Sequence, residues 1–212
     1  MTSLVGKPAP TFGTLKDQHG ADFESSTVFG KEPVCLFFYP QAMTYGTLKV
    51  RAGRARVTAQ QAKRSIFVVL VLCTGCTKEA CSLRDVSAKP AFSRDDNSKV
   101  LRIIGISSDS VEKQAEFDKK YDLNYTLLSD TQKEARKAFG VSGSALMGLA
   151  VRKWRTSRCL HVGPKLISRY TERVTFIIDR KGIVRGVEDS SINMAAHTRL
   201  VEKWVPILSA EA

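Results

Sequence analysis

Long apolar runs, cysteines and histidines are all scarce in this sequence. The longest apolar run, IFVVLVL at residues 66–72, has the length of a strand and falls short of the roughly 20 residues that a membrane helix needs. The first ten residues, MTSLVGKPAP, show no basic stretch followed by an apolar one, so we expect neither a secretory signal nor a membrane partner. Five cysteines in 212 residues form no regular framework. We therefore expect an intracellular location, in the cytoplasm or the nucleus, where cysteines are more often catalytic or inert than disulfide-bonded.

Acidic residues are absent from two stretches of an otherwise balanced chain. The formal net charge is +12, and residues 45–73 and 150–171 each contain six basic side chains and no acid. The rest of the chain holds 21 basic and 21 acidic residues and is therefore neutral. This pattern indicates a neutral domain interrupted by two basic inserts.

Two interpretations of the inserts are open. Basic side chains without a neighbouring acid are typical of a patch that contacts nucleic acid. Translated intron sequence is the other interpretation, since a pyrimidine-rich tract before an acceptor site would encode a run such as IFVVLVL. We favour the intron interpretation and do not expect nucleic acid to be a partner.

Strand and helix patterns alternate in the neutral part of the chain. Short apolar runs rich in branched and aromatic residues predict strands, and segments with mixed charge and helical spacing predict helices. The last two strands form a hairpin around the turn RKG, and an earlier hairpin is expected around His19 and Gly20. This order predicts an α/β domain with a central mixed sheet flanked by helices. Predicted strands span residues 33–40, 100–108, 125–130, 173–179 and 183–189, and predicted helices span 77–88, 111–121, 133–140 and 194–208.

Four stretches of the neutral part resemble one enzyme family. They are VGKPAPTFGTLKDQHG, FFYPQAMT followed later by GCTKEACSLRD, IIGISSDSVEKQAEFDKKYDLNYTLLSD, and RVTFIIDRKGIVR. Together they resemble the peroxiredoxins, specifically the branch of the bacterioferritin comigratory protein and peroxiredoxin Q. The resemblance implies a single thioredoxin-like domain over residues 1–212, with irregular insertions at about 45–73 and 150–171. It also implies a peroxidase that reduces hydrogen peroxide and organic hydroperoxides with a cysteine thiolate, in antioxidant defence and redox homeostasis.

The resemblance assigns five residues to the catalytic site. The family's loop after the strand reads Pro-x-x-x-Thr-x-x-Cys, and Pro40 and Thr44 match its start. The first insert then intervenes, and the pattern resumes with a glycine and Cys76, which corresponds to the attacking cysteine. Cys81 matches the resolving cysteine of this branch, and Arg173 in the RVTF stretch matches the family's arginine.

The chemistry of a thiolate explains why these residue types are needed. Only the thiolate is nucleophilic, and a helix N-terminus and a nearby guanidinium both favour it. We expect Cys76 in the first turn of a helix, with Arg173 facing it from a strand and stabilising the charge that develops on the peroxide. Thr44 would orient the peroxide, and Pro40 would screen the sulfur from water.

The resemblance also implies a catalytic cycle. Attack leaves a sulfenic acid on Cys76, Cys81 condenses with it to a disulfide, and thioredoxin reduces the bridge. Five residues apart on an intact helix, two Cα atoms lie about 8–9 Å from each other, which is too far for a disulfide. The helix must therefore unwind in each cycle. No cofactor or metal is implied, and the branch is typically a monomer or a weak dimer.

Two other functions compete with this interpretation. Cys73 and Cys76 spell C-T-G-C, so a thiol–disulfide oxidoreductase could use that pair. A basic thioredoxin-fold protein that binds nucleic acid through its inserts, with an impaired peroxidase site, is the other alternative. We expect Cys73 to be incidental.

We expect no catalytic or metal-binding role for the remaining cysteines and the histidines. Cys35 lies within an apolar strand and is expected in the core, while Cys159 is a chance member of the second insert. A zinc site at Cys73, Cys76 and Cys81 would need a convergent histidine. The three histidines are scattered along the sequence, so we do not expect such a site.

Overall fold

Seven strands form one mixed sheet in the computed structural model, which describes residues 4–40, 42, 76–93, 100–141, 173–190 and 193–211. Our predictions for Thr44, Cys73, Cys159 and the two inserts fall outside these residues. The strand order is β2-β1-β5-β4-β3-β6-β7, with β3 parallel to β4 and antiparallel to β6. The strands are β1 (Leu15–Asp17), β2 (Asp22–Phe23), β3 (Val34–Phe38), β4 (Arg102–Ser107), β5 (Thr126–Ser129), β6 (Val174–Ile178) and β7 (Val184–Glu188).

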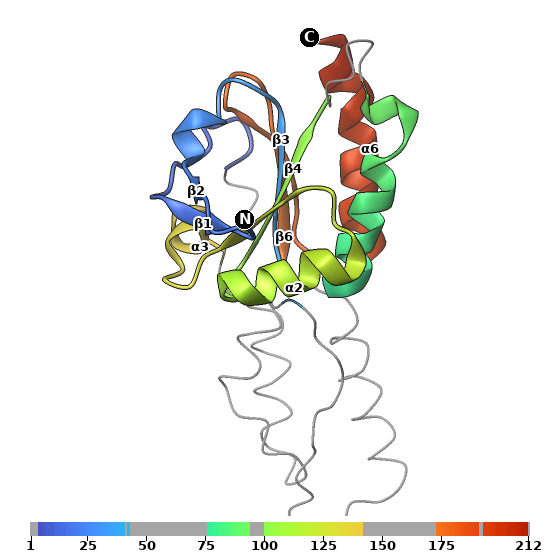
Figure 1. The fold of residues 1–212 in the computed structure, drawn as a ribbon. Coiled ribbons are helices and arrows are strands. Elements are labelled where there is room, and N and C mark those ends of the chain that lie inside the picture. The colour runs from blue at the N-terminus through green and yellow to red at the C-terminus, as the bar shows by residue number, and fades with distance from the viewer. Residues whose placement is uncertain are drawn as a thin grey trace, which may run out of the picture.

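Helices cover both faces of the sheet. Residues 76–87 are helical and lie beside α6 on one face, with α2 running across the lower end of the sheet (Figure 1). The short helix α3 and the β1–β2 hairpin lie on the opposite side (Figure 1). The labelled helices are α2 (Val111–Tyr121), α3 (Glu134–Ala138) and α6 (Met194–Ala210), with 3-10 turns η2 (Ser25–Thr27) and η3 (Pro90–Phe92). No helix of the described residues has the length and apolar character needed to cross a membrane.

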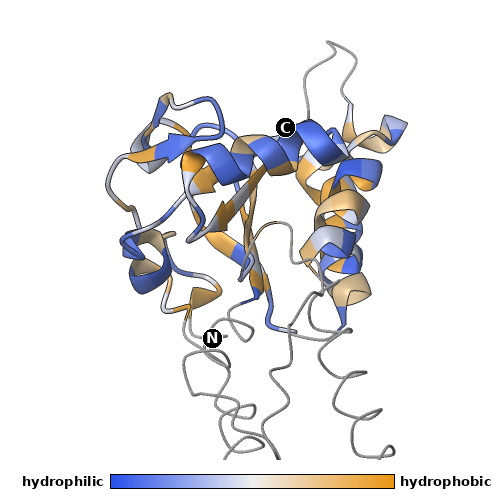
Figure 2. Cartoon of the chain, turned by 60° about the horizontal axis from the view of Figure 1, so that its bottom comes forward, coloured by the Kyte–Doolittle hydropathy of each residue, from blue (hydrophilic) through white to orange (hydrophobic). Residues whose placement is uncertain are grey.

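The inner strand β3 faces a separate apolar cluster on each side of the sheet. Cys35 and Phe37 point into the cluster beneath helix 76–87, α2 and α6, whereas Leu36 and Phe38 point into the cluster beneath α3. Both faces of this strand are thus covered, which explains why its sequence is continuously apolar rather than alternating. Figure 2 shows mainly apolar strands in the interior, next to helices that carry both hydrophilic and hydrophobic residues. The prediction that Cys35 belongs to the core is confirmed, since its side chain is fully buried.

Most predicted elements agree with the structure to within a few residues. The mixed sheet, the hairpin of β6 and β7, and the β1–β2 hairpin around His19 and Gly20 are all present. The last helix extends past the predicted Leu208 to Ala210 and contains Pro206 in its interior. At the start of α2, Ser110 occupies the N-cap position but makes no side-chain cap bond. The neighbouring Asp109 instead directs its carboxylate toward the loop that follows β3.

Candidate active site

Cys76 lies in helix 76–87, next to the residue that precedes strand β6. It is the first described residue of that helix, and its side chain is buried. Arg173 directly precedes β6, and its Nη2 atom donates a hydrogen bond to the Cys76 Sγ atom at 2.9 Å. Arg173 is itself buried, so little water screens its charge from the sulfur. A buried guanidinium in contact with a thiol stabilises the thiolate form of that thiol.

Glu79 holds the other edge of the Arg173 guanidinium. It follows Cys76 by three residues, so both side chains project from the same face of the helix. Glu79 Oε2 lies 2.8 Å from Arg173 Nε, and both side chains are buried. Burial raises the pKa of the Glu79 carboxyl, while the nearby Arg173 and His197 act in the opposite direction. The arginine is therefore fixed between a sulfur and a carboxyl group inside the protein.

His197 extends this buried chain of polar groups into α6. Its Nδ1 atom lies 3.4 Å from Glu79 Oε1 and 2.8 Å from the Thr175 hydroxyl of β6. Its Nε2 atom lies 2.7 Å from the backbone carbonyl oxygen of Ser190. The histidine is fully buried, and its ring is oriented from both nitrogens.

Pro40 lies just beyond the end of β3, in the loop next to this site. The antiparallel register pairs Phe38 with Val174, which places Arg173 beside the start of that loop. The loop is held from two directions. Arg136 Nη2 in α3 donates to the backbone carbonyl of Tyr39 at 2.6 Å, and the backbone N–H of Ala42 donates to the Asp109 carboxylate. The backbone around Pro40 is thus fixed by buried charged groups from two separate elements.

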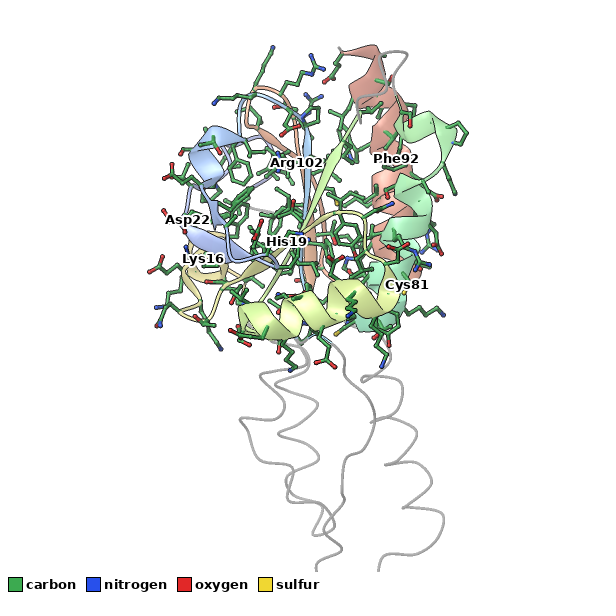
Figure 3. The ribbon with its side chains drawn as sticks, in the orientation of Figure 1. Lys16, His19, Asp22, Cys81, Phe92 and Arg102 are labelled. Atoms are coloured by element: carbon green, nitrogen blue, oxygen red, sulfur yellow. The ribbon has the colours of Figure 1, made fainter. Side chains whose placement is uncertain are left out.

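Cys81 lies one and a half turns along the same helix and is partly exposed. Figure 3 shows it on the helix near one end of α2, on the side of the molecule where α6 lies. Burial raises the pKa of the Cys81 thiol, Asp85 adds to the rise, and Arg84 opposes it. Cys76 and Cys81 are not joined to each other by a disulfide in this structure.

Comparison with known proteins assigns this arrangement to a family. The model of the family described as AhpC/TSA matches residues 47–187, which is more than half of the chain. The chain belongs to the AhpC/TSA family. The predicted resemblance to the peroxiredoxins is therefore confirmed, and with it the activity of a thiol-dependent peroxidase.

Individual relatives agree with this assignment. A protein of Mycobacterium tuberculosis (strain CDC 1551 / Oshkosh) with the name "Putative peroxiredoxin" is 32% identical over 183 residues, covering 86% of this chain and 84% of its own length. Peroxiredoxin Q, chloroplastic, from Sedum lineare is 29% identical over 192 residues, covering 91% of this chain and 72% of its own. This peroxiredoxin is thus similar to the peroxiredoxin Q and bacterioferritin comigratory protein branch, as its motifs predicted.

Solved structures share the fold. The crystal structure of peroxidoxin BcpB from Mycobacterium tuberculosis matches with a TM-score of 0.60 at 29% identity, covering 97% of this chain and 96% of that one. A Xanthomonas campestris peroxiredoxin Q matches with a TM-score of 0.60 at 21% identity, covering both chains fully, and at that identity it shows the fold alone. The predicted thioredoxin-like fold is confirmed.

The structure brings some of the predicted site residues of this peroxiredoxin together. Cys76 and Arg173 are in contact, Cys81 lies on the same helix as Cys76, and Pro40 lies at the end of the adjacent strand. Thr44 lies outside the described residues. Within the described ranges, no group of three or more histidine, cysteine or acidic side chains could hold a metal ion.

Two buried residues of the site were missed by the sequence reasoning. Glu79 lies within GCTKEAC, and its spacing of three from Cys76 on a predicted helix is the available signal. His197 is one of three histidines scattered along the sequence. Its position in the predicted helix 194–208, four residues before the apolar Val201, was compatible with a buried face, but no sequence signal connected it with Glu79.

Proposed function

We propose that Cys76 is the peroxidatic cysteine and Arg173 the residue that activates it. The observation that carries this proposal is the 2.9 Å contact between Arg173 Nη2 and Cys76 Sγ, between two buried side chains. A guanidinium at that distance favours the thiolate over the thiol. It also offers positive charge at the place where negative charge develops on the peroxide oxygen during attack.

The reaction is a two-electron oxidation of the sulfur. The Cys76 thiolate attacks the terminal oxygen of the hydroperoxide, forming an S–O bond while the O–O bond breaks. The leaving oxygen takes up a proton and departs as water or an alcohol. Cys76 is then a sulfenic acid. Pro40 would limit the access of water to the sulfur, and Thr44 would orient the peroxide for in-line attack.

Cys81 is proposed as the resolving cysteine. Its thiol attacks the sulfenic sulfur of Cys76, an S–S bond forms, and water leaves. Both cysteines belong to one continuous helix, and their five-residue separation holds the sulfurs apart while that helix is intact. Disulfide formation therefore requires helix 76–87 to open. A thioredoxin-type dithiol then returns both cysteines to thiols by supplying two electrons.

The setting of the reaction is proposed from the same residues. We propose hydrogen peroxide and organic hydroperoxides as substrates, thioredoxin as the reductant, and a monomer or weak dimer as the working form. We also propose an intracellular location, in the cytoplasm or the nucleus, where cysteine thiols stay reduced. We further propose that residues 1–212 form one domain, with the two basic inserts as additions to it.

Disulfide mapping tests the assignment of the two cysteines. The reduced chain is treated with one equivalent of hydrogen peroxide, quenched with iodoacetamide and digested for mass spectrometry. We expect a Cys76–Cys81 linked peptide, and in Cys81→Ser we expect dimedone to label Cys76. Cys35→Ser is the matched control and should give the same linked peptide, because Cys35 is buried in the core. A Cys73–Cys76 link, or dimedone on a cysteine other than Cys76, would overturn the proposal.

A further inference from the structure

The donors and acceptors that surround His197 indicate which of its ring nitrogens carries a proton. The Ser190 carbonyl oxygen, 2.7 Å from Nε2, can only accept a hydrogen bond, so Nε2 carries a proton. The other nitrogen, Nδ1, lies 2.8 Å from the Thr175 hydroxyl, which can either donate or accept. The protonation of Nδ1 is therefore decided by the third group beside it, the Glu79 carboxyl.

Glu79 and His197 require one additional proton between them. Glu79 Oε1 is buried and lies 3.4 Å from His197 Nδ1. If neither atom carried a proton, a buried carboxylate oxygen would face a nitrogen lone pair, which is strongly unfavourable. Either the imidazole is protonated and points N–H toward the carboxylate, or the carboxyl is protonated and points O–H toward the imidazole. Both arrangements contain the same extra proton.

We propose that His197 is a positioning residue of the peroxidatic site, which shares one proton with Glu79 and thereby leaves the charge of Arg173 available to Cys76. Within this chain, Glu79 competes with the Cys76 sulfur for the same guanidinium. A proton on the Glu79–His197 pair cancels the charge of the carboxylate. The positive charge of Arg173 then acts on the sulfur instead of being neutralised by Glu79.

Charge balance in the buried site supports this role. With the shared proton, the thiolate of Cys76, the guanidinium of Arg173 and the neutral Glu79–His197 pair sum to zero. Without that proton the same groups carry a net charge of −1 in a buried site, where an uncompensated charge is costly. Forming the thiolate is then harder, because a second anion is already present. The polar contacts of His197 are with Glu79, Thr175 and Ser190, so it acts on Cys76 through Glu79 and Arg173.

The groups that face His197 come from three segments. Glu79 projects from helix 76–87, Thr175 from β6 with Arg173 just before it, and the Ser190 carbonyl from the chain after β7. Among these, Glu79 and Arg173 are the ionisable groups. The state of His197 is therefore coupled to Cys76 through these two side chains.

Site-resolved alkylation of the full chain tests the proposal. The chain and His197→Gln are reacted with iodoacetamide between pH 5.5 and 9, and modification of Cys76 and Cys81 is followed by mass spectrometry. Glutamine can keep the donor to Ser190 but places no group at Nδ1. We expect the alkylation rate of Cys76 at neutral pH to fall by about tenfold, as for the loss of one favourable nearby charge, while the rate of Cys81 stays unchanged. Equal effects on both cysteines, or no effect on Cys76, would overturn the proposal.

Two further variants separate positioning from simple structural support. His197→Asn places an N–H donor near the position of Nδ1 but cannot supply the extra proton, so we expect the Cys76 rate to stay about as low as in His197→Gln. In a Glu79→Gln background there is no carboxylate to neutralise, so His197→Gln should have no further effect on Cys76. Full recovery of the rate by asparagine, or a full effect of His197→Gln in the Glu79→Gln background, would contradict the shared proton.

An NMR measurement on the unsubstituted His197 side chain tests the proposal even if the His197 variants fail to fold. Long-range 1H–15N spectra report which ring nitrogens of His197 are protonated. We expect a proton on Nε2 in the folded chain, and altered 15N shifts of the His197 ring in Cys76→Ser, which cannot form a thiolate. An unprotonated Nε2, or identical ring shifts in the two proteins, would overturn the inference. Neither this readout nor alkylation needs peroxide turnover, so a failure here is distinguishable from a failure of the proposed peroxidase mechanism on which the inference rests.

Discussion

Arg173 joins Cys76 to Glu79 at the scale of single residues. One nitrogen donates to the Cys76 sulfur, and another lies 2.8 Å from Glu79. A planar guanidinium can serve both partners at once, which the single ammonium of a lysine cannot do with the same geometry. The Arg173 guanidinium therefore both favours the thiolate form of Cys76 and supplies the positive charge beside it.

Replacing Arg173 by glutamine removes the charge while keeping a polar side chain. We expect the second-order rate constant of Cys76 with hydrogen peroxide to fall by about 100-fold or more, the usual effect of losing one preorganised donor at a developing negative charge. Stopped-flow measurement of a single turnover checks this. Arg185→Gln is the matched control, because Arg185 pairs with Asp179 and Glu211 at a partly exposed position. Equal rates for Arg173→Gln and the unaltered chain would contradict the role given to Arg173.

The thiol of Cys81 should titrate above the range of an ordinary free cysteine. Its pKa is raised first by burial and then by the charge of Asp85, so the thiolate appears only as the pH rises past the usual value. Asp85→Asn removes one cause of the rise and should shift the alkylation midpoint of Cys81 to lower pH. Iodoacetamide labelling against pH, in a Cys76→Ser background, measures this midpoint. Glu116→Gln on the exposed side of α2 serves as control, and a midpoint that rises in Asp85→Asn would contradict the electrostatic account.

In the proposed cycle helix 76–87 must open, and specific contacts oppose its opening. The Tyr125 hydroxyl donates to the backbone carbonyl of Ala80 at 3.0 Å, in a buried position. Arg84 donates to the Tyr121 carbonyl at the end of α2, and the Ser87 hydroxyl lies 3.0 Å from the Asn124 side chain. The segment that joins α2 to β5 thus holds the helix that carries both cysteines.

Tyr125→Phe removes one of these contacts without changing the ring. We expect disulfide formation after sulfenic acid formation to accelerate by about fivefold, as the loss of roughly 1 kcal/mol from a neutral hydrogen bond would produce. Quenched alkylation after a peroxide pulse measures the rate of this step. Lys16→Gln, which breaks an exposed ion pair with Asp22 on the other side of the sheet, should leave it unchanged. A slower or unaltered step in Tyr125→Phe would show that this contact does not restrain the helix.

Elements were more predictable from the sequence than the contacts between them. Continuous apolar runs identified β3 and β4 because both faces of these strands are covered, and the resemblance identified Cys76 and Arg173 as partners. The Glu79–His197 contact joins positions more than a hundred residues apart in the sequence, and nothing in local periodicity encodes it. Similarly, no local pattern in the sequence indicates that the Asp109 carboxylate accepts a hydrogen bond from the backbone N–H of Ala42.

Tight packing at the centre of the sheet gives a test at the scale of the whole molecule. A Cβ atom added at Gly105 in β4 would lie 2.7 Å from Phe37 Cζ and 2.9 Å from Leu127 Cδ2. We expect Gly105→Ala to lower the free energy of unfolding by about 1–3 kcal/mol, the usual range for overpacking in a core. Gly13→Ala is the control, since only the end of the flexible Glu134 side chain lies close. Urea unfolding measures both, and equal stabilities would contradict the close packing of β3, β4 and β5.

The two basic inserts also bear on the whole molecule, because the first separates Thr44 from Cys76 in the sequence. A chain lacking residues 46–74 and 150–171 restores the spacing Thr44-Tyr45-Gly75-Cys76. We expect it to turn over peroxide up to about 100-fold faster than the full chain, since small misplacements of catalytic groups cost that much. Steady-state assays with thioredoxin and its reductase compare the two forms. A shortened chain that is no faster would show that the inserts do not disturb the site.

The most direct test of the account is a single-turnover measurement of hydrogen peroxide consumption by the reduced full chain, with Cys76→Ser and Cys35→Ser in parallel. We predict that the full chain and Cys35→Ser each consume one equivalent of peroxide and lose the free thiol of Cys76, while Cys76→Ser consumes none at a comparable rate. Peroxide consumption that continues undiminished in Cys76→Ser would contradict the central claim that the thiol held by Arg173 is the one that attacks.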